Sequence, residues 1–208
     1  NHPDVADSLL NLGILKMKQG EYIESKESLY KSLKIYDQVI GQESLESAAV
    51  LQVLGGVFGY SQEFEEASKI YSAAFSINLK LLGKDHPTTA ANMIGLAYSG
   101  MNLGYYEEAE KLNLYALEIT TKKYGDMHPQ TSAIMNNLGW LFTLKGEYKK
   151  AEKYYQKVLE INENSFNNLS SYNAMTLNNL GWLYVLKGQD SLAKKVLKEG
   201  FKNSIKLI

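Results

Sequence analysis

The chain has 208 residues, of which 45% are hydrophobic and 22% charged, and its formal net charge is -1. This balance weighs against a nucleic-acid partner, because nucleic-acid-binding proteins present a basic surface. All 22 basic residues are lysine, and the chain has no cysteine, which excludes disulfide bonds and thiolate zinc sites. The lack of cysteine fits a reducing compartment, and we expect a cytoplasmic protein. No apolar run reaches membrane-spanning length, and we expect neither a nucleic-acid nor a membrane partner.

One short sequence recurs along the chain at a fixed spacing. Residues 135–142 read MNNLGWLF, and residues 177–184, 42 positions later, read LNNLGWLY. Weaker copies begin at the same interval upstream. Five copies at one period predict a repeat array rather than a domain with one central core. The repeats are assigned to residues 1–40, 41–82, 83–124, 125–166 and 167–208, in one array that we expect to be a fragment of a longer protein.

Each repeat opens with a signal for the start of a helix, here named helix A. Three repeats begin with His-Pro, at His2, His86 and His128, while the second and fifth have serine there. Proline is favoured in the first helical turn, where its missing N–H would have no partner in any case. A small residue follows the central leucine in every copy, which predicts close approach of a second helix. The small residues are Gly13, Gly55, Ala97, Gly139 and Gly181.

A turn and a second helix, helix B, complete each repeat. The turn contains glycine in four repeats and Gln62 in one, and an aromatic residue opens helix B in the first four. Helix B is expected to end near Gly41, Gly83, Gly125 and Asn167. The unit is therefore an αα-hairpin, which buries its apolar face only when neighbouring hairpins stack.

These residues resemble the tetratricopeptide repeat. The small and large positions of that repeat are matched by Leu138-Gly139, Phe142, Ala151 and Tyr155. The 42-residue period, the His-Pro-x-x-Ala/Ser entry and the Asn-Asn-Leu-Gly sequence look like the kinesin light chain type. The resemblance covers the whole chain. It implies an all-α fold, an α-solenoid of five antiparallel helix-turn-helix units that form a right-handed superhelix, with helices A on the concave face.

One face of helix A is nearly free of charge. This helix-A stripe comprises positions 7, 10, 11, 14, 17 and 18 and their equivalents at 42-residue intervals, and only Asp7 and Lys18 among its thirty residues are charged. A solvated face normally carries lysine and glutamate, so a face of amides and aromatic rings is typical of a binding surface. The predicted peptide-binding residues are Asn11, Gln52, Tyr60, Tyr98, Asn102, Asn136, Asn137, Trp140, Asn178, Asn179 and Trp182.

The residue types in this stripe suit an extended peptide. Asparagine amides both donate to and accept from a peptide backbone, and tryptophan supplies broad apolar contact. The resemblance implies that Asn11, Asn137 and Asn179 form a ladder along the peptide, a ladder that Val53 and Gly95 interrupt. Gly56 and Gly59 are expected to leave a shallow hollow for a bulky side chain. The neutral stripe favours an uncharged, apolar or aromatic motif in the partner.

Three patterns in the sequence have alternative explanations. For the tryptophans, the alternative to ligand contact is packing between neighbouring helices A. The asparagines have a structural role as an alternative, in which they bond one another between repeats. The three histidines share one register, and we interpret them as helix entry signals rather than metal ligands. Zinc requires nitrogens within about 2.1 Å of the ion, whereas equivalent residues of stacked helix pairs lie about 10 Å apart or more.

The function that follows is a protein-interaction module that binds an extended peptide or partner segment. The alternative is a structural or regulatory spacer within a multidomain signalling protein. No nucleophile, base and orienting group recur together, so we expect no enzyme activity, no cofactor and no metal. Self-association through uncapped ends is also considered, because a truncated array exposes apolar surface.

Overall fold

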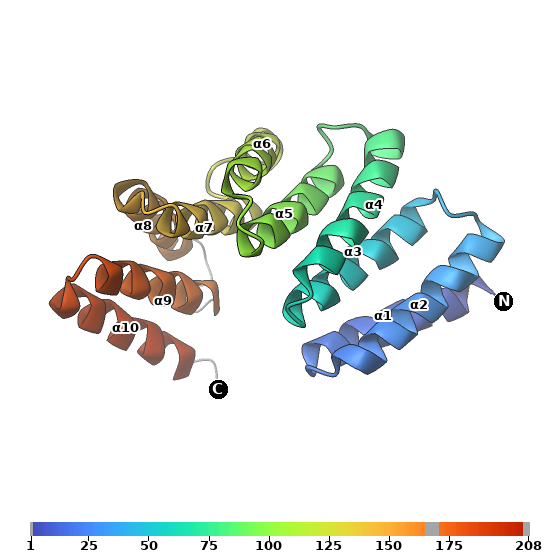
Figure 1. Cartoon of the computed structure of the whole chain (residues 1–208), viewed down its shortest axis with the longest axis horizontal. Helices are drawn as coiled ribbons and strands as arrows, with labels where there is room; N and C mark the ends of the chain where they lie inside the picture. Colours follow the sequence, from blue (N-terminus) through green and yellow to red (C-terminus); the bar gives the residue numbers. More distant parts are fainter. Residues whose placement is uncertain (1, 165–170, 206–208) are drawn as a thin grey trace. The chain divides into compact units, whose positions relative to one another are not determined.

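The computed structural model describes residues 2–164 and 171–205, and within them it contains ten α-helices and no strand (Figure 1). Each predicted repeat contains one helix pair, so the expected all-α solenoid of helical hairpins is confirmed. The helices are α1 (Pro3–Lys18), α2 (Tyr22–Val39), α3 (Leu45–Tyr60), α4 (Phe64–Leu82), α5 (Pro87–Asn102), α6 (Tyr106–Tyr124), α7 (Pro129–Leu144), α8 (Tyr148–Asn164), α9 (Ser171–Leu186) and α10 (Asp190–Ile205).

The chain divides into two compact units, residues 1–112 and 113–208, and the division falls within α6. In the first unit α1 to α5 pack in sequence order, and α3 also contacts both α1 and α5. In the second unit α7 to α10 pack in order, and α7 also contacts α9. Each unit therefore has a layer of adjacent helices A. A single array over residues 1–208 stays a prediction.

The entry histidines act as helix caps. The Nδ1 atoms of His2, His86 and His128 each accept the backbone N–H two residues ahead, at 3.2 Å. A cap of this kind satisfies one of the backbone donors that a helix start leaves without an intrahelical partner. The interpretation of the three histidines as helix entry signals is confirmed. In the second repeat Ser44 caps α3 through Ser47 N–H, whereas Ser170 of the fifth repeat lies outside the described residues.

The short turns between the helices require a left-handed backbone. Gly20, at the first turn, has φ of 79°, and the equivalent Gln62 has φ of 63°. Glycine adopts this conformation without steric cost, whereas glutamine does so only at some strain. The register of the turn is therefore kept even where its usual residue is replaced.

Small residues in helix A let a large side chain of helix B approach closely. A Cβ added to Gly139 would lie 2.6 Å from the ring of Tyr155, and one added to Gly13 would lie 2.6 Å from Leu29. Glycine inside a helix costs about 1 kcal/mol relative to alanine, and the close contact that it permits explains why glycine is kept here. The predicted close approach of the two helices is confirmed at these positions.

The central leucine of helix A is buried in some repeats but not in the first. Leu12 is 41% exposed, whereas its equivalents Leu54 and Leu138 are fully buried. Helix α2 packs against α3 and contributes Leu29 and Tyr36 to the cluster that contains Leu54, whereas no helix precedes α1 among the described residues. The glycine-rich segment at residues 55–59 lies within the continuous helix α3.

We predict that Gly95→Ala destabilises the first unit. A Cβ at Gly95 would lie 2.4 Å from the ring of Tyr71, which is held on its other side by Gly55. Overpacking at such a site lowers the free energy of unfolding by about 1 to 3 kcal/mol, measured by denaturant unfolding. The control is Gly100→Ala, whose new Cβ would meet its neighbours at 3.7 Å or more. Equal stability of the two variants would contradict the packing argument.

Candidate functional site

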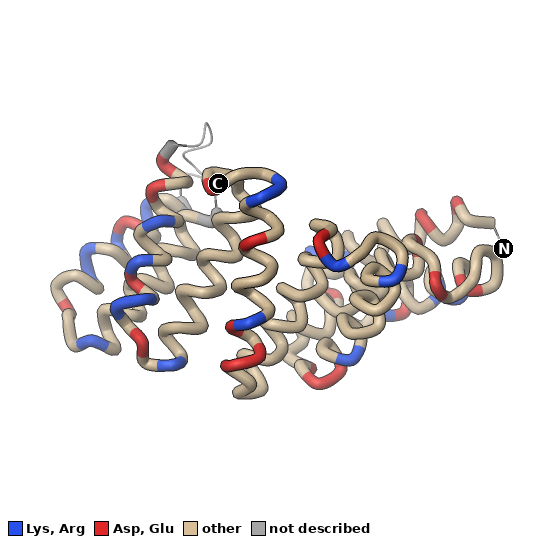
Figure 2. The backbone as a smooth tube through the Cα atoms, turned by 90° about the horizontal axis from the view of Figure 1, so that it is seen from above, with Lys and Arg blue, Asp and Glu red and all other residues tan. Residues whose placement is uncertain are grey.

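The helices A form a layer with almost no charge. Helices α5, α7 and α9 contain no aspartate, glutamate or lysine, and α3 contains only Glu46. Figure 2 shows the charged residues along the backbone, and they gather on helices B, on the turns and on α1. A partner that lies on the helix-A layer therefore meets amide, hydroxyl and apolar groups instead of ions.

Most of the helix-A stripe is accessible to solvent. Its buried members are Gly59, Gly95, Met101, Asn136 and Thr143, and the remaining residues of the stripe are exposed or partly exposed. Neutral residues are common in a core, but here most of them lie at the surface. The absence of charge is therefore a property of the surface rather than a consequence of burial.

The predicted site residues separate into two groups, one in each unit. In the first unit Asn11 and Asn102 are exposed, Gln52 is partly exposed, and Tyr60 and Tyr98 are 65% and 42% exposed. In the second unit Asn178 is exposed, Trp182 is 49% exposed, and the partly exposed residues are Asn137, Trp140 and Asn179. Ten of the eleven residues thus have surface available for contact.

Asn136 is the exception, because its side chain lies inside the protein. It is 4% exposed, and its Oδ1 atom accepts hydrogen bonds from Thr176 Oγ1 at 3.1 Å and from Asn179 Nδ2 at 3.4 Å. Both donors belong to α9, in the following repeat. The structural role considered for the asparagines is therefore present at Asn136, and Asn179 contributes to it while keeping part of its surface exposed.

Asp7 is one of the two charged residues of the stripe, and its carboxylate is already engaged. The Tyr36 hydroxyl of α2 donates a hydrogen bond to Asp7 Oδ1 at 2.5 Å. Burial and this carboxylate together raise the pKa of Tyr36 to about 12. The charge at this end of the stripe therefore stabilises the first hairpin.

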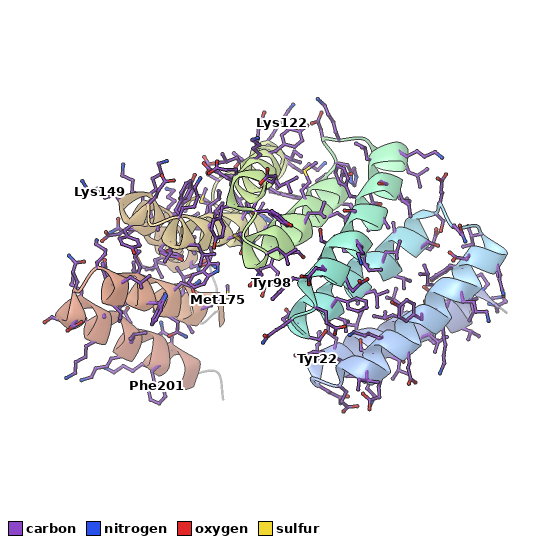
Figure 3. The ribbon with its side chains drawn as sticks, viewed as in Figure 1. Tyr22, Tyr98, Lys122, Lys149, Met175 and Phe201 are labelled. Carbon is purple, nitrogen blue, oxygen red and sulfur yellow. The ribbon has the colours of Figure 1, made fainter. Side chains whose placement is uncertain are left out.

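Aromatic residues gather in the first unit, including several that the sequence analysis did not select. The Tyr22 ring, labelled in Figure 3, stacks parallel to Tyr60 with centroids 6.4 Å apart. Phe64 meets the edge of Tyr98 at 6.0 Å. Tyr22 and Phe64 open helices B, and the aromatic residue that recurs at that position was the signal available in the sequence.

The hollow expected at Gly56 and Gly59 does not extend over Gly59. Tyr98 projects from α5 so that its ring would lie 3.6 Å from a Cβ at Gly59, and Gly59 is buried. Gly56 remains partly exposed, and a Cβ there would lie 3.5 Å from the Tyr71 hydroxyl. A hollow at Gly56 stays a prediction.

Metal-ligand clusters and membrane-spanning helices were looked for in the part of the chain that the structure describes. No group of three or more histidine, aspartate or glutamate side chains is placed to hold a metal ion there. None of the helices in residues 2–164 and 171–205 combines the length and the apolar character needed to cross a membrane.

The sequence matches a family model over most of its length. The tetratricopeptide-repeat model matches residues 4–72, 101–164 and 144–205. The chain belongs to the tetratricopeptide-repeat family. It is accordingly a protein-interaction repeat module, whose partners are expected among proteins. A comparison with the curated proteins finds no match in sequence.

Several solved structures share the fold at low sequence identity. BtubC (BKLC) from P. vanneervenii superposes with a TM-score of 0.80 at 18% identity, over 99% of this chain and 82% of that one. A putative kinesin light chain from Podosopora anserina with nearly identical repeats gives 0.75 at 21% identity, over 100% and 98%. A Rap protein complexed with competence and sporulation factor gives 0.82 at 18%, over 95% of this chain and 53% of that one.

We predict that Asn136→Ala destabilises the second unit by about 1 to 3 kcal/mol, because Thr176 and Asn179 lose their buried acceptor. Denaturant unfolding measures the change. Asn178→Ala is the matched control, since Asn178 is the exposed residue at the equivalent position of the next repeat. Loss of its side chain should change the free energy of unfolding by less than about 0.5 kcal/mol. An Asn136→Ala protein as stable as the control would show that this contact carries no structural weight.

Proposed function

We propose that the helix-A stripe binds an extended peptide or partner segment. The observation that carries the proposal is an accessible, almost charge-free layer of helices A that presents amide groups and aromatic rings. Exposed tryptophan and tyrosine are enriched where proteins bind one another. The Rap protein of similar fold was solved as a complex with competence and sporulation factor, which supports ligand binding by this type of scaffold.

The chemistry of the stripe defines the partner. Its amides donate to and accept from a peptide backbone, and its rings pack against apolar or aromatic side chains. Lysine and arginine are absent from the stripes of α3, α5, α7 and α9, so a carboxylate clamp has no residues from which to form. The partner segment is therefore internal and largely uncharged, and its motif is apolar or aromatic.

We further propose that the protein acts in the cytoplasm, as a binding scaffold and not as an enzyme. Self-association through the end of the second unit is a further contact of this scaffold. Leu197 is exposed there, whereas Tyr155, the equivalent residue one repeat earlier, is fully buried. The helix that carries Tyr155, α8, is followed by α9, which packs against it.

The proposal predicts that Trp182→Ala weakens peptide binding by tenfold or more, because Trp182 is the most exposed tryptophan of the stripe. A peptide array probed with the wild-type protein identifies binding sequences, and fluorescence anisotropy then measures the dissociation constant for each variant. The substitution removes a half-exposed side chain, so the melting temperature should change little.

Tyr30→Ala is the matched control, since Tyr30 is an equally exposed aromatic residue on helix α2, outside the stripe. The peptide affinity of the Tyr30→Ala variant should equal that of the wild type. If Trp182→Ala and Asn137→Ala both bind every selected peptide as tightly as the control, the stripe is not the binding surface and a spacer role is favoured instead.

A further inference from the structure

An open groove lies on the last hairpin, here named the tail groove. Its volume is about 470 Å³, and its apolar lining comes from Val185 of α9 and from Ala193, Leu197 and Phe201 of α10. Leu197 and Phe201 are 38% and 67% exposed. Figure 3 shows the labelled Phe201 on the side of α10 that faces away from α9. The groove is therefore an apolar surface that the described part of the second unit leaves accessible.

Helix α1 has an apolar seam whose equivalents are covered in later repeats. This head seam consists of Val5, Leu12 and Leu15, which are 50%, 41% and 51% exposed. The residues equivalent to Val5 and Leu15 are buried in all four later repeats. Helices α3, α5 and α9, which carry three of these equivalents, each pack against the preceding helix B. The tail groove and the head seam thus correspond to the two halves of the junction between successive repeats.

The α2–α3 junction shows how the two halves meet within the chain. Leu29 and Leu33 of α2 pack in one cluster with Leu54 and Val57 of α3. Leu29 and Leu33 stand four repeat periods before the leucine and phenylalanine of the tail groove. Leu54 and Val57 stand one period after the two leucines of the head seam. A junction in the same register therefore brings the exposed apolar residues of α10 onto those of α1.

An ion pair of the α2–α3 junction has both of its residue types in this register. Lys26 of α2 pairs with Glu63, the N-cap residue of α4 in the following repeat. The equivalent of Lys26 in the last repeat is Lys194, which lines the tail groove. The equivalent of Glu63 in the first repeat is Glu21, the N-cap residue of α2. Lysine and glutamate are thus available at the two ends for the same pair.

A second charge of the tail groove also corresponds to carboxylates on the head. Burial raises the pKa of the Tyr30 phenol, and the carboxylates of Glu66 and Glu63 in the following repeat raise it further. Lys198 of the tail groove is the equivalent of Tyr30, and Glu24 is the equivalent of Glu66. The same register therefore brings a lysine, instead of a tyrosine, toward two carboxylates.

A ring pair of the junction is replaced by opposite charges. Tyr22 stacks on Tyr60 of the following repeat with centroids 6.4 Å apart. The equivalent of Tyr22 in the last repeat is Asp190, which stands where the first four repeats have an aromatic residue. The equivalent of Tyr60 in the first repeat is Lys18, one of the two charged residues of the helix-A stripe. Two departures from the repeat pattern, one on each end, are thus complementary to each other.

One like-charge approach accompanies these pairs. Lys26 Nζ lies 4.1 Å from the centroid of the Phe58 ring, and the equivalent of Phe58 in the first repeat is Lys16. Lys16 already forms an ion pair with Glu21. In the register of the α2–α3 junction this carboxylate lies between Lys16 and Lys194, which offsets their repulsion.

We propose that the tail groove of one copy receives helix α1 of a second copy, head to tail, in the register of the α2–α3 junction. An unrelated apolar helix fits the leucine and phenylalanine of the groove, but the first hairpin also matches the sign of its three charges. The inference rests on the self-association proposed above and names the surface that the second copy contributes. A head-to-tail contact leaves one groove and one seam open, so further copies can add.

Sedimentation equilibrium of the 208-residue chain tests the association. The average mass of the wild type should rise above the monomer mass of 23.4 kDa as the concentration increases. Phe201→Ala should weaken the association tenfold or more, because the contact buries this exposed ring. Ile23→Ala is the matched control, since Ile23 is 73% exposed and its equivalents are exposed in every later repeat. The control should associate like the wild type.

Charge reversal tests the direction of the contact. The head variant carries Glu21→Lys and Glu24→Lys, and the tail variant carries Lys194→Glu and Lys198→Glu. Each variant alone places like charges together and should associate at least tenfold more weakly than the wild type. An equimolar mixture should recover the association, because the unchanged tail of one variant meets the unchanged head of the other. All four side chains are exposed or partly exposed, so circular dichroism should show unchanged helix content.

Three results would overturn the inference. A wild type that keeps the monomer mass at millimolar concentration shows that no second copy occupies the groove. Variants that associate as strongly as the wild type, or a mixture that recovers nothing, show that the contact is not head to tail. Peptide binding is measured separately. If it depends on Trp182 while the wild type stays monomeric, the stripe proposal stands and this inference fails alone.

Discussion

A large side chain of helix B packed against a small residue of helix A is the contact on which each hairpin depends. At Gly13, Gly55, Gly139 and Gly181 the space of a missing Cβ is taken by leucine or tyrosine from the partner helix. The helices then lie close enough for the short turn to join them, and the apolar side chains beside the contact become buried. Because the contact recurs every 42 residues, it also sets the register in which successive hairpins stack.

This stacking determines which residues reach the surface. The central leucine and its small neighbour face helix B, so the opposite side of helix A stays accessible over most of its length. That side carries amides and rings with almost no ions, which suits the neutral partner that we propose. The same contact has a different outcome in the two units. Tyr155 is fully buried with its hydroxyl 3.3 Å from Thr143 Oγ1, whereas Tyr71 is partly exposed and its hydroxyl lies beside Gly56.

The sequence was sufficient for the fold because its signals are periodic and local. Glycine in the turn, proline after histidine and the Leu-Gly pair each predict one structural feature, and five repeats make their agreement hard to produce by chance. The candidate site was less predictable. A helical wheel places Asn136 and Asn137 on one side of α7, yet Asn136 turns inward to accept bonds from α9, and only the packed neighbours decide this. The position of the Tyr71 ring likewise depends on Gly95, which belongs to the next repeat.

The central claim is that the neutral stripe of helices A receives the partner segment. The most direct measurement is an NMR titration of the chain with a peptide selected from an array, because its two tryptophans, Trp140 and Trp182, both lie in the stripe and give separate indole N–H signals. The account predicts that stripe signals, from the indoles in the second unit or from Tyr60 and Tyr98 in the first, shift as the peptide saturates the protein. The imidazole signals of the capping histidines should stay in place. Saturable binding that shifts the histidines and leaves all stripe signals unchanged would contradict the account.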